Sequence, residues 1–270
     1  MSPQRFLMRI VQGSLAAVIA LLLLVGSPER MWAQASAGGS ASPTTAQQAA
    51  PKDLTGYWVS VVTEDWRWRM VVPIKGDFAS VPLNPEGRKM ASSWDPSQAA
   101  GEDQCKAYGA AAIMRVPGRL HISWQDGNTL RIDTDSGMQT RLLHFGGTPP
   151  STLAAELQGY SAASWEGMPP AGRGQANPSG PDLKGYLKVV TTHMRPGYLR
   201  RNGIPYSANA TLQEYLDRFN EPNGDNWLVA TIVVTDPQYL TQPYVTHAVF
   251  KKLATNSGWD PTPCRADEAR

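Results

Sequence analysis

The sequence predicts an all-β protein: an antiparallel barrel or sandwich of about ten strands, with one short helix near residues 84–94. Segments with strand composition recur at short spacing from Leu54 to Leu253. Turn sequences such as Asp126-Gly127 and Asn223-Gly224 separate several of them, as in β-hairpins. No stretch alternates strand and helix as a parallel α/β fold does. We therefore expect a single β domain over residues 53–264, followed by a tail at 265–270.

The expected strands follow from apolar periodicity and from the turn residues between them. They are Leu54–Val62, Trp66–Val72, Arg119–Gln125, Asn128–Thr134, Met138–Phe145, Gly159–Trp165, Tyr186–His193, Ala210–Phe219, Trp227–Thr235 and Val245–Leu253. The second of these alternates clearly, because Trp66 and Trp68 share a face and Arg67 and Arg69 lie opposite. This alternation predicts a half-buried strand.

One segment has the signals of a helix. Asn84 is a good N-cap, Pro85 suits the first helical position, and Glu86 complements the positive end of the helix dipole. The helix is expected to end near Trp94, before Asp95-Pro96. Residues 168–181 are rich in proline and glycine and are expected to form a long loop.

The N-terminus has the organisation of a bacterial signal peptide over residues 1–35. Arg5 and Arg9 form a basic region, Gly13–Gly26 is apolar, and Ala33-Gln34-Ala35 is a cleavage site of A-x-A type. The apolar stretch is shorter than the roughly 20 residues that span a bilayer, and a retained anchor is the alternative. We expect a periplasmic or secreted protein, joined to a membrane only through an uncleaved signal segment. Residues 36–52 are expected to be a flexible linker.

The charge distribution argues against a nucleic-acid partner. The chain has a formal net charge of +2. Residues 1–35 contain three arginines (Arg5, Arg9, Arg30) and one glutamate (Glu29), so they account for the whole of this charge. The remaining domain is close to neutral and lacks the basic surface of a nucleic-acid-binding protein.

Two cysteines, Cys105 and Cys264, lie in the exported part. In an oxidising compartment two cysteines most simply form one disulfide, with two free thiols as the alternative. Four histidines occur (His121, His144, His193, His247), and none has the spacing of a local metal motif. Neither a metal site nor a cofactor is expected.

Strand parity marks two candidate catalytic residues. In the strand at 186–193, His193 shares a face with Val189 and Thr191, and in the next strand Glu214 shares a face with Leu212 and Leu216. A buried carboxylate is costly unless it is paired or hydrogen-bonded. One interpretation is that either residue is a general acid or base in a ligand cavity. The alternatives are an internal ion pair of Glu214 with a cation such as Arg218, and a strand edge near the barrel rim. Tyr206 is the third catalytic candidate, as a group that stabilises negative charge.

The segment between the strands at 186–193 and 210–219 is the densest binding candidate. It contains Arg195, Tyr198 and Arg200, and loops at a barrel mouth commonly bind ligands. Aromatic residues could line an apolar pocket: Trp66, Trp68, Trp124, Tyr160 and Trp165. The alternatives are a solvated basic loop and aromatic filling of the core.

Several motifs between Gly159 and Pro243 resemble a group of uncharacterised exported bacterial proteins. The shared pattern is G-x-S-x-x-x-W-E-G, a strand ending in T-T, G-x-P-x-S, a glutamate, and D-P-x-x-Y-T-x-P. In this chain it falls on residues 159–167, Thr191-Thr192, residues 203–207, Glu214 and residues 236–243, although in the last motif the tyrosine, Tyr239, stands one position earlier than in the pattern. The resemblance implies a lipocalin-like barrel and no particular function. The chain departs from the pattern at Tyr206, where a histidine is expected before the serine.

These observations lead to an expected function and two rivals. The leading hypothesis is a lipocalin-like binding protein for a small apolar or aromatic molecule inside the barrel. The first rival is a cofactor-free acid/base enzyme on the same barrel, such as an isomerase, a cyclase or a lyase. The second rival is a structural envelope module that binds glycans or another protein through exposed aromatic residues.

Overall fold

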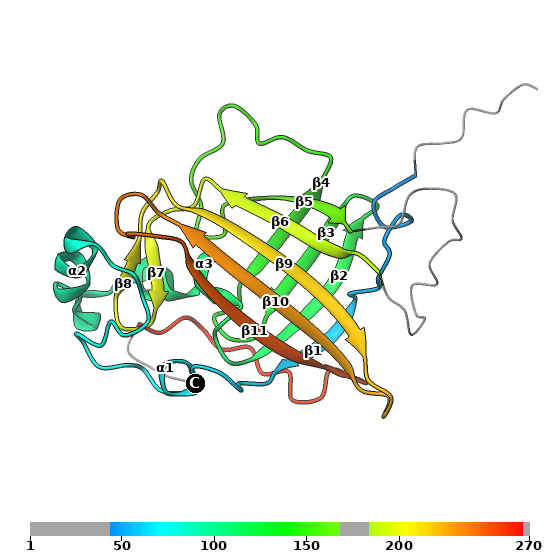
Figure 1. The fold of residues 1–270 in the computed structure, drawn as a ribbon, viewed down its shortest axis with the longest axis horizontal. Coiled ribbons are helices and arrows are strands. Elements are labelled where there is room, and N and C mark those ends of the chain that lie inside the picture. The colour runs from blue at the N-terminus through cyan, green and yellow to red at the C-terminus, as the bar shows by residue number, and fades with distance from the viewer. Residues whose placement is uncertain (1–43, 168–183, 267–270) are drawn as a thin grey trace, which may run out of the picture. The chain divides into compact units, whose positions relative to one another are not determined.

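A computed structural model describes residues 44–167 and 184–266, which belong to one compact unit, Pro43–Arg270 (Figure 1). Its strands are β1 (Gly56–Ser60), β2 (Arg119–Asp126), β3 (Thr129–Thr134), β4 (Thr140–Phe145), β5 (Tyr160–Glu166), β6 (Tyr186–Thr192), β7 (Gly197–Arg200), β8 (Ile204–Tyr206), β9 (Thr211–Asn220), β10 (Asn226–Thr235) and β11 (Tyr244–Leu253). Its helices are α1 (Trp66–Arg69), α2 (Pro85–Ser92) and α3 (Ala110–Ile113), with 3-10 helices η1 (Pro96–Gln98) and η2 (Gly101–Tyr108).

Nine strands form a closed barrel in the order β1-β11-β10-β9-β6-β5-β4-β3-β2. Each of the nine lies within two residues of a strand expected from the sequence. All neighbours are antiparallel except β4 and β5, which are parallel. The expectation of a purely antiparallel barrel is therefore wrong. Strand direction alternates around an antiparallel ring, so a closed ring with an odd number of strands must contain a parallel pair.

The barrel interior is filled by side chains from the inward faces of the strands. Buried residues alternate with partly exposed ones along β6, β9 and β10, as expected for strands with one face in a core. Large members of this core are Trp58, Ile122, Leu143, Leu187 and Phe250, each almost fully buried. The interior is therefore packed with apolar side chains, and polar groups are the exception within it.

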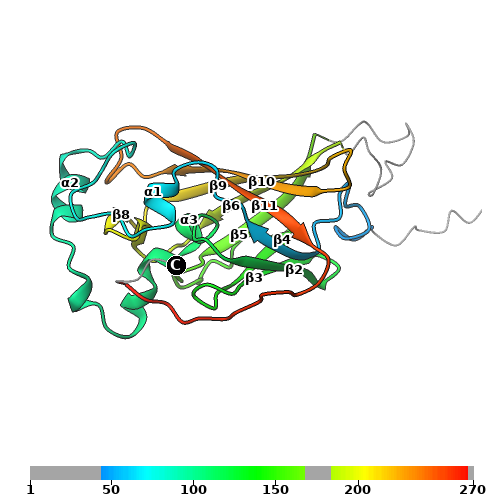
Figure 2. The same cartoon turned by 90° about the horizontal axis from the view of Figure 1, so that it is seen from below.

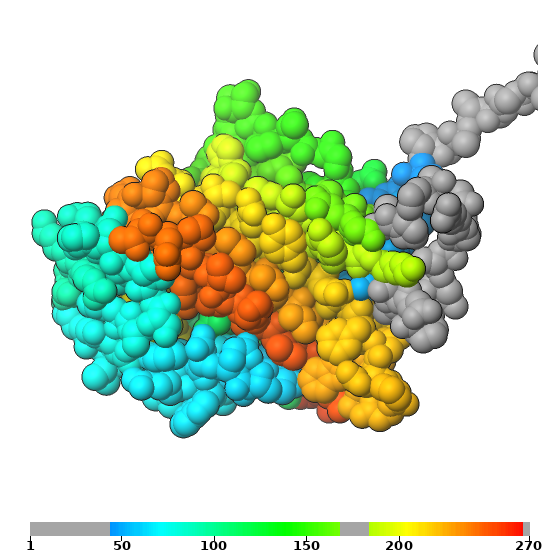
Figure 3. Space-filling view, in the orientation of Figure 1, coloured from blue at the N-terminus to red at the C-terminus, as the bar shows by residue number. Residues whose placement is uncertain are grey.

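One end of the barrel, where β9 begins and β10 ends, is covered by α1, α2, α3, β7 and β8 (Figure 1). We call it the capped end; in the space-filling view the segment that includes α1 and α2 lies over it (Figure 3). Two expectations fail here. Residues 66–69 form a helical turn and not a strand, so that Trp66 is 62% exposed and Arg69 is buried. The expected loop before Ala210 contains the hairpin β7–β8.

The helix α2 is confirmed within this cap. The side chain of Asn84 accepts a hydrogen bond from the Gly87 amide (2.8 Å), and Pro85 is the first helical residue. The helix ends at Ser92, two residues before the expected end. None of the helices in the described part of the chain has the length and apolar composition needed to cross a lipid bilayer.

The opposite end of the barrel is covered by residues 44–54. The Trp165 indole donates a hydrogen bond to the Ala46 carbonyl (3.0 Å), and the Gln47 amide donates to the Gly127 carbonyl (3.0 Å). The last residues of the expected linker are thus attached to the barrel. Residues 1–43 lie outside the described part of the structure, and so does the expected loop at 168–181.

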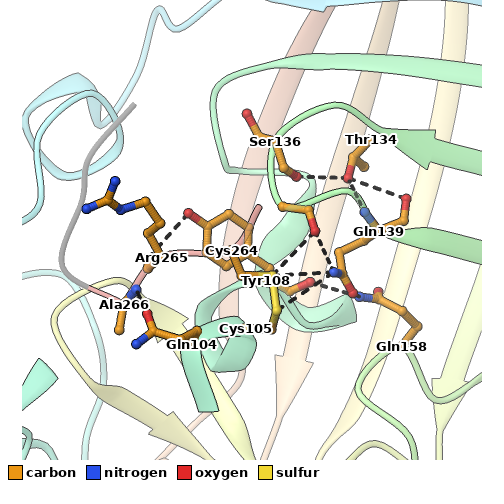
Figure 4. The surroundings of a disulfide bond; sticks show 11 residues. Gln104, Cys105, Tyr108, Thr134, Ser136, Gln139, Gln158, Cys264, Arg265 and Ala266 are labelled. Atoms are coloured by element: carbon orange, nitrogen blue, oxygen red, sulfur yellow. Dashed lines mark hydrogen bonds between the residues drawn. A yellow bond between two sulfur atoms is a disulfide. The ribbon is translucent and has the colours of Figure 1, made fainter. Parts of the chain in front are cut away.

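The C-terminal tail returns along the outside of the barrel beside β2 and β3 (Figure 2). The Thr262 amide donates to the Asp135 carbonyl (2.9 Å), and the Gly137 amide donates to the Thr262 carbonyl (2.8 Å). A disulfide between Cys105 and Cys264 then joins the tail to η2, which confirms the expected pairing (Figure 4). Gln139 lies against this bond, 3.4 Å from the Cys264 sulfur. The disulfide is compatible with an oxidising extracellular compartment.

Candidate functional site

A buried polar cluster in the barrel interior is centred on Glu214 of β9. Both carboxylate oxygens accept hydrogen bonds from the Arg141 guanidinium, at 3.0 and 2.5 Å, and each residue is only 1% exposed. Thr191 contacts the same guanidinium at 3.4 Å and hydrogen-bonds Ser161 at 2.7 Å. The expected internal ion pair therefore exists, with Arg141 of β4 as the cation.

Arg218, named in the sequence as a partner of Glu214, lies at the opposite end of the barrel. Its guanidinium donates to the Asp53 carbonyl (2.6 Å) and to the side chain of Asn226 (2.5 Å). It shares the inward face of β9 with Glu214, but it lies four positions further along the strand. Glu214 and Arg218 therefore share a strand face, as expected, but they do not form the ion pair.

His193 does not meet Glu214. The strand β6 ends at Thr192, and His193 follows in a left-handed conformation (φ 56°) that places it on the exposed surface. Its Nδ1 atom lies 2.9 Å from the Thr192 hydroxyl. The expected inward position of His193 is wrong, because the alternation of β6 stops one residue earlier. No acid/base pair of His193 and Glu214 is formed.

Tyr206 is fully buried beneath η2 and β7. Gly109 and Gly197 make room for its ring, since a Cβ atom at either position would lie only 2.3 or 2.6 Å from the phenol oxygen. That hydroxyl makes no hydrogen bond to any residue in the described part of the chain. Burial raises the pKa of the Tyr206 phenol above its usual value, although the positive charges of Arg195 and Arg141 act against this.

Replacing Tyr206 with Phe is expected to leave the free energy of unfolding unchanged or raise it by about 1 kcal/mol at neutral pH, because an unpaired buried hydroxyl is lost. The folded protein retains the phenol proton above the pH at which the unfolded chain releases it. Ionisation of Tyr206 therefore leaves the free energy of unfolding unchanged below about pH 10, and it lowers this free energy as the pH rises beyond that value. Urea unfolding should therefore show a smaller alkaline loss for Tyr206→Phe.

Tyr160→Phe is the matched control, since this ring stacks on His144 at 4.8 Å and is only partly buried on the barrel surface. We expect it to keep the wild-type alkaline profile. A loss of several kcal/mol in Tyr206→Phe at neutral pH would contradict the absence of a hydrogen-bond partner.

The residues expected to bind a ligand fall into separate groups. Trp124 and Trp165 both pack on Phe145 at the end covered by residues 44–54, with ring centroids 5.5 Å apart in each pair. Arg195 pairs with Glu102 on the surface, and Tyr198 is half-buried in the cap. Burial raises the pKa of the Tyr198 phenol. Two other expected residues, Arg200 and Trp68, are in direct contact at the capped end.

Arg200 lies against two aromatic rings at the capped end. Its guanidinium is 4.6 Å from the centroid of Trp68 and 5.9 Å from that of Tyr244. It also donates to the carbonyl of Ala79 (2.7 Å), while the Trp68 indole donates to the carboxylate of Asp77 (2.9 Å). The two residues therefore fix the loop at 76–82 from its inner side.

The outer side of this loop borders an open hollow of about 640 Å³. We call it the capped-end hollow; its lining is residues 76–82 together with Arg88 of α2 and Gln242. Phe78 and Val81 supply apolar surface, and Asp77 and Arg88 supply charge. No sequence pattern predicted this hollow, because its wall is an irregular loop shaped by tertiary contacts.

A second set of buried cations lies next to Arg200. Arg69, Arg115 and Arg201 are each at most 5% exposed and line a small, partly open space together with Arg200. We call these four residues the arginine cluster. Sequence alternation placed Arg69 on an exposed strand face, so this residue was missed. Arg201 lies in the segment between the strands at 186–193 and 210–219, for which the sequence predicted a binding loop or a solvated basic loop.

The motif residues in the suspected family pattern have structural partners. Ser161, Thr191 and Glu214 belong to the interior polar cluster. The Ser207 amide and hydroxyl donate to the two carboxylate oxygens of Asp236 at 2.7 and 2.8 Å, both residues being buried. These contacts join the β8–β9 connection to the β10–β11 connection.

Comparison of the chain with protein-family models, with curated proteins and with solved structures gave no match. The resemblance to exported bacterial proteins therefore stays a prediction. Among the residues that the structure describes, no group of three or more His, Cys, Asp or Glu side chains is placed to bind a metal ion.

Proposed function

We propose that this is an exported binding protein that takes a small molecule with an apolar part in the capped-end hollow. The observation that supports it is the hollow itself, whose volume of about 640 Å³ lies within the range of roughly 300–1,000 Å³ common for small-molecule sites. The site differs from the barrel interior expected from the sequence, because that interior is packed with side chains.

The lining suits a ligand with both apolar and polar atoms. Phe78, Val81 and Pro82 offer apolar contact, while Arg88 and Gln242 can donate hydrogen bonds to a polar group. Trp68 and Arg200 act as positioning residues in this proposal, because they bond to Asp77 and Ala79 of the hollow's wall. An exported location in the periplasm or outside the cell is part of the proposal and agrees with the disulfide.

Titration of intrinsic tryptophan fluorescence with a panel of small apolar and aromatic compounds should give a saturable response. Trp68 is the expected reporter, since its indole bonds to Asp77 at the edge of the hollow. Phe78→Ala should weaken binding about tenfold, because it removes part of the apolar contact, which costs about 1.4 kcal/mol. The midpoint of thermal unfolding serves as the check that the variant is folded.

The matched control is Phe219→Ala, at a phenylalanine that is 39% exposed on the outside of the barrel. It should bind the ligand as the wild type does. Absence of any saturable response across the panel, or equal weakening by both variants, would rule out the capped-end hollow as the site.

A second candidate function rests on the outer face of β6, β9 and β10. Tyr186 and Tyr215 lie there with ring centroids 5.9 Å apart and, with Phe219 and Val229, line a hollow of about 490 Å³. Exposed aromatic rings of this kind favour the glycan-binding reading. If soluble oligosaccharides bind and Phe219→Ala weakens them while Phe78→Ala does not, the outer face is the functional surface.

A further inference from the structure

The arginine cluster is a continuous arrangement of buried cations between α1, α3 and β7. The Arg69 guanidinium donates to the Arg115 carbonyl (3.0 Å), and the Arg201 guanidinium donates to the Arg69 carbonyl (2.6 Å). Arg200 borders the same space and stacks on Trp68. Arginine is rarely buried unless its charge is compensated by a neighbouring carboxylate or another acceptor.

Among the described residues, two carboxylates contact Arg69 and Arg115, both from the solvent side of the cluster. Glu64 lies 3.2 Å from Arg69, and Asp65 lies 2.8 Å from Arg115. Arg200 instead contacts neutral groups, namely the Ala79 carbonyl and the Tyr244 hydroxyl. Among the described residues, no carboxylate lies within ion-pair distance of Arg200. Arg69, Arg115 and Arg200 therefore carry one more positive charge than the carboxylates that contact them.

Two residues that line the space, Arg69 and Arg200, each have a buried donor without an acceptor in the described part of the chain. Nη2 of Arg69 and Nε of Arg200 are buried and make no hydrogen bond to any residue that the structure describes. A buried guanidinium N–H without an acceptor is unfavourable. Burial and the nearby charge of Arg115 also lower the pKa of Arg69 to about 10, although Glu64 and Asp65 act against this. The negative charge of Glu64 and Asp65 is therefore too small to balance the positive charge of the arginines that line the space.

The space is small and partly open, and its wall is largely apolar apart from the guanidinium groups. Its volume is about 20 Å³, enough for one guest the size of a water molecule or a halide ion. Ala107, Ala112 and Val116 form part of its wall. Low polarity around a charge strengthens its attraction to a counter-ion.

We propose that the arginine cluster binds a small monovalent anion, with Nη2 of Arg69 and Nε of Arg200 as donors. The anion supplies the missing negative charge and the missing acceptor at the same time. It also joins α1 to β7, and so stabilises the cap over the barrel. This site lies on the inner side of the loop at 76–82 and does not depend on the ligand proposed for the capped-end hollow.

Thermal unfolding of the full chain, with chloride replacing gluconate at constant ionic strength, tests the proposal. Gluconate is too large for a space of about 20 Å³, so only chloride should occupy the site. We expect a saturable rise of the unfolding midpoint by about 4 °C. Arg69→Met should abolish this rise, and Arg69→Lys should retain part of it because the charge remains.

Arg131→Met is the matched control, since Arg131 forms a surface ion pair with Asp133 away from the cluster. It should respond to chloride as the wild type does. An equal response in Arg69→Met and Arg131→Met, or no response in the wild type, would overturn the proposal.

A second measurement uses the unaltered protein, in case the cluster variants fail to fold. Crystals soaked in bromide should show an anomalous peak between Arg69 Nη2 and Arg200 Nε. A soak that gives peaks elsewhere on the protein but none between these two atoms would contradict an anion site.

Discussion

Replacing Glu214 with Gln is expected to lower the free energy of unfolding by about 3–5 kcal/mol. The substitution leaves the Arg141 guanidinium charged and 1% exposed in the barrel interior, with its carboxylate partner gone. Neither residue can reach water without opening the barrel. Urea unfolding followed by far-ultraviolet circular dichroism would measure the loss, and a change below 1 kcal/mol would contradict the ion-pair geometry.

The double variant Arg141→Met/Glu214→Leu separates the cost of an unpaired charge from the contribution of the pair. Removing both charges together is often neutral or stabilising, by about 1–4 kcal/mol, when apolar side chains fill the space. We expect the double variant to be at least as stable as the wild type. At the surface ion pair of Lys251 and Asp225, Asp225→Asn should change stability little, because both groups are well solvated.

Replacing both cysteines with Ala is expected to lower the free energy of unfolding by about 4–5 kcal/mol in the loop-entropy description, and by at least about 2 kcal/mol from measured disulfides. The predicted loss is large because Cys105 and Cys264 are 159 residues apart in sequence, so the bond strongly restricts the unfolded chain. Urea unfolding of the oxidised wild type and the double variant would test this.

Loss of the disulfide should also loosen the tail locally. Trp259 packs edge-on against Tyr57 (5.7 Å) and His121 (6.4 Å), and these contacts depend on the position of the tail. Trp259→Phe distinguishes tail release from global unfolding, since only the reporter is removed. If the double cysteine variant keeps both its stability and its tryptophan emission, the disulfide contributes nothing to the tail.

Strands were the most predictable part of the fold. The strands β9, β10 and β11 combine apolar alternation with clear turn sequences, and both signals depend on nearby residues only. The parallel pairing of β4 with β5 could not be predicted, because it depends on which strand closes the ring. Alternation over Trp66–Val72 predicted a strand, but the structure has the one-turn helix α1 there. The direction of α1 is set by contacts of Arg69 with distant residues.

The candidate sites were less predictable for a similar reason. Glu214 was found as a charged residue on an apolar strand face, and the same test would have found Arg141, which shares its face with the buried Leu143. The arginine cluster could not be found this way. Its members come from α1, from the residues after α3 and from the end of β7, and only the folded chain brings them together.

The position of β1 has a consequence for how the protein folds. This strand pairs with β2 on one side and with the last strand on the other, so that Tyr57 lies opposite Leu253. Hairpins such as β2–β3 and β9–β10 can form as soon as their own residues are present. Ring closure must wait for the C-terminal strand, and such long-range contacts slow folding. A chain truncated before β11 would therefore have an open sheet with two unpaired edges, a form prone to aggregation.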